Sequence, residues 1–229
     1  MSHAKFESML QKAIDTRMHD ISRRRLFRNA AIAGGSMAAL GTVGFAAAQD
    51  ATPADDMAAE GMTFESPVDV LNYALTLEHL EAAFYRDGLA EIGAEGITAL
   101  GFQQSVFDSL TEIGEHEAEH VTTLTDVITQ LGGEPVVEAT YDFGYTDAAG
   151  FLQVAQALED TGVSAYTGAA QFLIEEDELL TAALTIHGVE ARHASYLALV
   201  NAVSPFPEAF NPPLTPAEVL EIATPLIVG

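Results

Sequence analysis

Two short stretches of the chain share the pattern Glu-x-x-His: EAEH at residues 117–120 and EARH at residues 190–193. Each stretch interrupts a run of apolar residues spaced by three and four positions, which is the period of one helix face. The apolar residues of the two runs are Leu110, Ile113, Leu124, Ile128 and Leu131, then Ile186, Leu197 and Val200. Each stretch therefore predicts a helix that directs one carboxylate and one imidazole toward a core.

Two other apolar stripes each carry a single glutamate followed by a tyrosine seven residues later. These pairs are Glu78 with Tyr85 and Glu159 with Tyr166. Along the chain the order is Glu, Glu-x-x-His, Glu, Glu-x-x-His, which indicates an internal duplication. All four glutamates lie near the middle of their predicted helices, so a four-helix bundle would bring them to one level.

Four buried glutamates need compensating positive charge, because removing each ion from water costs several kcal/mol. Two divalent cations would supply that charge, and the two histidines would supply nitrogen ligands. The chain has no Cys, which excludes disulfides, iron–sulfur clusters and thiolate zinc sites. The predicted site holds two metal ions, iron or manganese, on Glu78, Glu117, His120, Glu159, Glu190 and His193.

Some features of the same helices have more than one interpretation. The alternative for the four glutamates is that they form no common site and that each is hydrogen-bonded independently by its own polar neighbours. Glu81, one turn after Glu78, can replace that residue or add a ligand. His79, His116 and His187 lie beside the inward stripes and are expected on helix flanks, with His187 also a candidate neighbour of the ligands.

Capping and breaking residues predict five helices. Ser66-Pro67 opens the first helix, Gly132-Gly133 ends the second, and Thr215-Pro216-Ala217-Glu218 opens a short last one. The predicted ranges are 66–87, 97–131, 147–174, 178–202 and a helix from about 216.

The lengths of the connections predict the topology. Short links join the first helix to the second and the third to the fourth, so each pair is an antiparallel hairpin. The link of about fifteen residues before residue 147 can extend ~50 Å, the length of the second helix. We therefore expect an all-α fold: a four-helix bundle with one long crossover, plus the short C-terminal helix.

At these residues the chain resembles the ferritin-like superfamily of di-metal carboxylate bundles. The resemblance implies that Glu78 and His120 are terminal ligands of one metal ion and that Glu159 and His193 are terminal ligands of the other. Glu117 and Glu190 would bridge the two ions. It also implies that Tyr85 and Tyr166 act beside the site, as redox or hydrogen-bonding neighbours.

Within that superfamily, residues 75–85 and 186–196 look most like exported bacterial ferritin-like domain proteins and plant desiccation-related proteins. The Pro-rich C-terminal extension departs from the storage ferritins and argues against a hollow cage, and the absence of Cys departs from rubrerythrin. The predicted di-metal centre, in a protein expected to be exported, favours a ferroxidase, or a peroxidase or catalase-like oxidoreductase, acting on iron, oxygen or peroxide under oxidative stress. The alternative is a non-enzymatic protein of desiccation or salt stress whose metals are structural. A homo-oligomer is left open.

The first 48 residues match a twin-arginine signal peptide. The segment 22–28 reads SRRRLFR, an apolar run follows, and Ala46-Ala47-Ala48 forms a small-residue cleavage site. We expect export to the periplasm, cell wall or exterior, with membrane contact only through this segment. The alternative is an uncleaved anchor, for which the glycine-rich run is poorly suited. Residues 49–64 are predicted to be a flexible linker, and residues 65–229 the ferritin-like domain.

Charge is distributed unevenly along the chain. Seven of the nine basic residues lie at or before Arg28, whereas residues 49–229 hold 31 acidic residues and two arginines, a formal charge of −29. Such a surface repels nucleic acid and anionic lipid. It suits a high-salt environment, where screening weakens self-repulsion, and a second interpretation is that it gathers metal cations.

Overall fold

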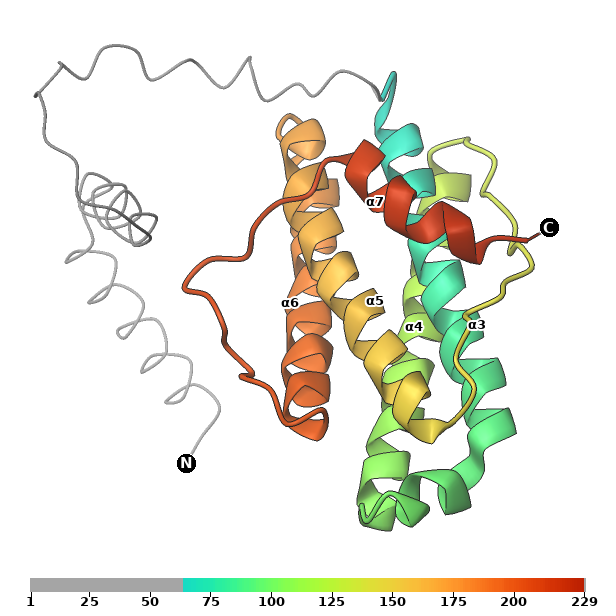
Figure 1. The fold of residues 1–229 in the computed structure, drawn as a ribbon. Helices are drawn as coiled ribbons and strands as arrows, with labels where there is room; N and C mark the ends of the chain where they lie inside the picture. Colours follow the sequence, from blue (N-terminus) through green and yellow to red (C-terminus); the bar gives the residue numbers. More distant parts are fainter. Residues whose placement is uncertain (1–63, 229) are drawn as a thin grey trace, which may run out of the picture. The chain divides into compact units, whose positions relative to one another are not determined.

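The structure is a computed structural model that describes residues 64–228, so the predicted signal peptide and nearly all of the predicted linker lie outside the described residues. Five α-helices make up the described part of the chain (Figure 1). They are α3 (Pro67–Ala99), α4 (Gln104–Gln130), α5 (Ala148–Ala169), α6 (Asp177–Val200) and α7 (Pro216–Ala223), with 3₁₀ turns at Ala170–Leu173 and Thr224–Leu226. The all-α prediction is confirmed.

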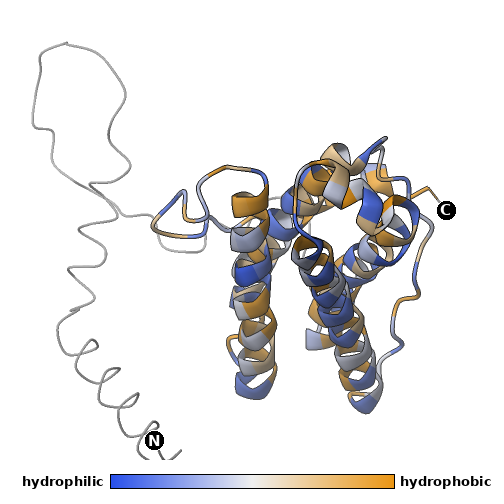
Figure 2. Ribbon diagram, turned by 90° about the horizontal axis from the view of Figure 1, so that it is seen from below, coloured by the Kyte–Doolittle hydropathy of each residue, from blue (hydrophilic) through white to orange (hydrophobic). Residues whose placement is uncertain are grey.

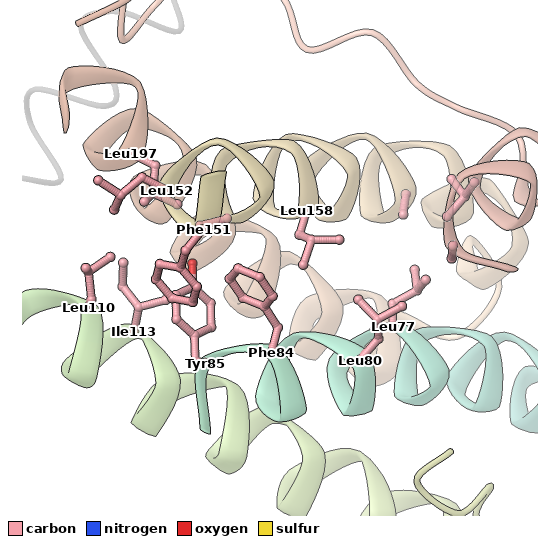
Figure 3. Packing of buried hydrophobic residues seen from close by; sticks show 14 of the residues in the cluster. Leu77, Leu80, Phe84, Tyr85, Leu110, Ile113, Phe151, Leu152, Leu158 and Leu197 are labelled. Carbon is pink, nitrogen blue, oxygen red and sulfur yellow. The ribbon is translucent and has the colours of Figure 1, made fainter. Parts of the chain in front are cut away.

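The four long helices form the bundle in two hairpins. Helix α3 packs against α4, α5 packs against α6, and α3 also packs against α5. Each long helix carries both hydrophobic and hydrophilic residues (Figure 2). In the core, Phe84 of α3 stacks on Phe151 of α5 with ring centroids 4.6 Å apart, next to Tyr85 (Figure 3). None of the helices in residues 64–228 is long and apolar enough to cross a membrane.

The link between α4 and α5 runs along α3, as its contacts show. Near the start of α3, the Asn72 side-chain amide donates to the Glu134 carbonyl oxygen. Further along α3, the Arg86 guanidinium binds both carboxylate oxygens of Glu138, at 2.9 and 3.0 Å. Later still, the Tyr145 hydroxyl donates to Glu91. Because α4 ends beside the start of α3, this course brings α5 back to begin at the same end as α4, and the long crossover is confirmed.

Three of the five described helices begin with a side-chain cap, and two of these caps, at Ser66 and Thr215, are those that the sequence predicts. The Ser66 hydroxyl accepts from the Asp69 backbone N–H, and the Asp147 carboxylate accepts from that of Gly150. Thr215 and Glu218 form a reciprocal capping box at the start of α7. Each cap satisfies a backbone donor that the first helical turn leaves free.

The predicted boundary between the first two helices was wrong. Helix α3 continues past Gly88 to Ala99, and α4 begins at Gln104 instead of residue 97. Gly88 does not end the helix; it lets α5 pack closely against α3. A Cβ placed at Gly88 would lie 2.4 Å from Cε2 of Phe151. The backbone leaves helical geometry at Gly93, where φ is 62°, a conformation that favours glycine.

Replacing Gly88 by alanine is expected to lower the free energy of unfolding by about 1–3 kcal/mol, the usual cost of overpacking a core. The Phe151 ring is fully buried against Phe84 and cannot move aside cheaply. Urea denaturation measures the effect. The matched control is Gly188→Ala in α6, where nothing lies within 4 Å of a new Cβ and a gain of about 0.5–1 kcal/mol is expected. Equal stabilities for the two variants would contradict this account.

Candidate metal centre

A cluster of ionisable side chains lies in the middle of the bundle, with contributions from all four long helices. Each member is at most 8% exposed to solvent. The members are Glu78 and Glu81 of α3, Glu117 and His120 of α4, Glu159 of α5, and Glu190 and His193 of α6. Such burial is rare for glutamate unless the charge is compensated.

Glu117 lies between the two histidines. Its Oε2 is 2.9 Å from His120 Nδ1, and its Oε1 is 2.9 Å from His193 Nδ1. One carboxylate therefore faces both imidazoles, one oxygen to each. A bridging ligand between two cations needs this arrangement.

The remaining carboxylates complete two similar groups. His120 Nδ1 lies 3.1 Å from Glu78 Oε2 and 3.3 Å from Glu190 Oε1. His193 Nδ1 lies 3.2 Å from Glu159 Oε2.

In each group the possible ligand atoms lie within 4.8 Å of one another, so each group could hold a metal ion. The groups are Glu78, Glu117, His120 and Glu190, and Glu117, Glu159, Glu190 and His193. The structure thus brings all six residues of the predicted site together, with Glu117 and Glu190 common to both groups. Metal binding by them stays a prediction.

The donor set fits metal ions of the predicted kind. Glu190 Oε2 is buried without a hydrogen-bond partner, and Glu117 Oε1 and Glu190 Oε1 have only the imidazole contacts given above, which are not aligned as hydrogen bonds. Oxygens in this state cost free energy unless a cation or a proton neutralises them. Carboxylate and imidazole together suit iron and manganese.

The electrostatics of the cluster favour a positively charged occupant. Burial raises the pKa of Glu78 to about 8 and the pKa of Glu159 well above its ordinary value. Burial alone would also raise the pKa of Glu117, but the two adjacent imidazoles outweigh it and hold that pKa at about 2. Burial lowers the pKa of His120, but the surrounding carboxylates raise it to about 12.

The two predicted tyrosines bind the outer carboxylates crosswise. The Tyr85 hydroxyl donates to Glu159 Oε1 at 2.6 Å, and the Tyr166 hydroxyl donates to Glu78 Oε1 at 2.5 Å. Each hairpin thus orients the carboxylate of the other hairpin. Hydrogen bonds of this kind fix the direction of a ligand and tune its metal. A redox role for the tyrosines stays a prediction.

His116 contacts the site, which the sequence pattern did not indicate. It is exposed on α4, yet its Nδ1 lies 3.0 Å from Nε2 of His193. Apolar periodicity cannot reveal such a contact, because His116 is outside the inward stripe. His79 and His187 point elsewhere, toward the Val136 carbonyl oxygen and the Thr167 hydroxyl.

Comparison with known proteins agrees with this geometry. A family model described as a ferritin-like domain matches residues 66–202. No curated protein matches the chain. The matched region contains all four long helices and every residue of the buried cluster, and it covers more than half of the 229 residues. The chain therefore belongs to the ferritin-like domain family.

Proposed function

We propose that this chain is a di-metal redox protein that oxidises ferrous iron or removes hydrogen peroxide under oxidative stress. The observation that carries the proposal is the sharing of Glu117 and Glu190 between two histidine-bearing groups. Shared carboxylates would hold two cations close enough to act on one small oxidant. Six protein ligands divided between two cations would also leave coordination positions for that oxidant.

Bound iron or manganese would supply two-electron chemistry with oxygen or peroxide, and the protein would supply the geometry. Oxidation of two ferrous ions by hydrogen peroxide consumes two protons and yields two waters. Peroxide disproportionation converts two peroxides into two waters and one oxygen. The chain's own part is to exclude water from the core and to hold Glu78 and Glu159 in place through the Tyr166 and Tyr85 hydroxyls.

The test of this activity compares loaded wild-type protein with Glu159→Ala and Tyr166→Phe. We expect the wild type to remove peroxide, or to oxidise ferrous iron, faster than the same amount of free metal. Turnover should vanish in Glu159→Ala, which lacks a terminal ligand of one metal ion. It should fall less in Tyr166→Phe. Peroxide loss and ferric absorbance are the measurements. Equal rates for wild type and Glu159→Ala, with two metals bound to the wild type, would reject the enzyme.

A non-enzymatic role in desiccation or salt stress is the second candidate. Its support is the depth of the site, since each of the six proposed ligands is at most 8% exposed and a substrate has little direct access. In that role the metals serve only to stabilise the bundle. A wild-type protein that holds two metals but turns over neither ferrous iron nor peroxide would favour it.

We also propose that the protein is exported by the twin-arginine route. The support is the SRRRLFR segment at residues 22–28, the apolar run after it and the alanines before Gln49. Replacing Arg23 and Arg24 together by lysine is expected to retain the precursor in the cytoplasm. Cell fractionation and the N-terminal sequence of the exported protein are the measurements. Normal export of the double variant would argue against this route.

A further inference from the structure

We propose that Glu81 is a seventh metal ligand, placed between the two metal positions. The inference rests on the metal site proposed above, but it concerns a residue outside the six that the Glu-x-x-His pattern supplies. Glu81 lies on α3, one turn after Glu78, and is 3% exposed. Its side chain forms no hydrogen bond with the described residues, and it lies beside, not within, the two groups whose ligand atoms are within 4.8 Å of one another.

The register of α3 against α5 places Glu81 between the two positions. Glu78 of α3 meets Tyr166 of α5, and Tyr85 of α3 meets Glu159 of α5. The two helices are therefore antiparallel, and the point midway between these contacts falls next to Glu81 on α3 and next to Gly162 on α5. One end of this segment belongs to the group of Glu78, and the other end to the group of Glu159.

Gly162 provides the space that the Glu81 carboxylate occupies. A Cβ built at Gly162 would lie 3.1 Å from Glu81 Oε1 and 3.0 Å from Glu190 Oε2. Both carboxylates therefore converge on the same small patch of α5. Glu190 Oε2, the oxygen on this side, has no hydrogen-bond partner, so no donor at that oxygen relieves the repulsion between the two acidic groups.

The two repeats of the internal duplication differ at this position. Glu78 corresponds to Glu159 and Tyr85 to Tyr166, so the position that corresponds to Glu81 is Gly162. One repeat carries the extra carboxylate and the other leaves room for it. Because a buried carboxylate without a partner destabilises the fold, a cation shared with Glu190 gives this asymmetry a physical reason.

Cobalt(II) absorption tests the assignment, because its bands change with the number and type of ligands and do not depend on turnover. The variants are Glu81→Gln, which keeps the shape of the side chain but not its charge, and Glu81→Asp, which keeps the charge but shortens the side chain. The control is Glu95→Gln, an exposed glutamate on the same helix. Calorimetric titration with Mn²⁺ measures the affinity of each protein.

Glu81→Gln is expected to shift the cobalt bands and to weaken the binding of at least one Mn²⁺ by about tenfold or more. Glu81→Asp should also shift the bands, and it decides the question if Glu81→Gln does not fold. Glu95→Gln should match the wild type. A wild type that binds two metals, with unchanged bands and affinity in both Glu81 variants, would overturn this inference and leave the six-ligand site intact. A wild type that binds no metal would overturn both.

Discussion

Replacing Glu117 by alanine is expected to leave the protein unable to retain either metal. Glu117 offers one oxygen toward each histidine, at 2.9 Å in both cases, so its loss opens both groups at once. Glu190 is also common to the two groups, and Glu190→Ala should have the same effect. The measurement is metal content per chain after loading with iron or manganese and desalting, with two expected for the wild type and none for either variant.

His79→Ala is the control for that experiment. His79 belongs to α3 as Glu78 does, but its Nε2 meets the Val136 carbonyl oxygen of the crossover at 3.2 Å. The variant should keep both metals. Retention of two metals by Glu117→Ala would show that this carboxylate is not shared, and a wild type that stays metal-free after loading would reject the site altogether.

The six central residues could be predicted because helical periodicity determines which side chains share a face. Glu117 and His120, three residues apart within an apolar stripe, must point the same way once the helix forms. The mid-helix position of each glutamate then places all four at one level of a bundle. Cross-pairing of Tyr85 with Glu159 was not predictable, because it depends on how one hairpin is set against the other.

Other features depended on packing that no local pattern encodes. Gly88 resembles a helix end in the sequence, yet it is a helical residue that admits the Phe151 ring, and the break comes at Gly93. The convergence of Glu81 on Gly162 needs the register of α3 against α5. Glycine is thus ambiguous in a sequence: it can end a helix or let two helices approach, and only the neighbouring element decides.

Removing the metals with a chelator is expected to lower the midpoint of thermal unfolding by roughly 10 °C or more. A ligand that binds only the native state stabilises it by RT ln(1 + [L]/Kd), about 4.1 kcal/mol at a thousandfold excess over Kd. For a domain of this size each kcal/mol shifts the midpoint by about 2–4 °C. The charge left uncompensated at the buried Glu190 oxygens without metal is part of this same binding free energy.

Calorimetric scans of loaded protein, of chelated protein and of chelated protein reloaded with Mn²⁺ measure this effect. Glu117→Ala is the matched control, since a protein that cannot hold the metals should melt at one temperature with and without Mn²⁺. If loaded and chelated wild type melt together although the loaded form holds two metals, those metals lie outside the buried cluster. Both the redox role and the structural role need metals in the core, so that result would count against both. A large shift of the unfolding midpoint that is restored by reloading would support a metal site in the core, and turnover would then distinguish the two roles.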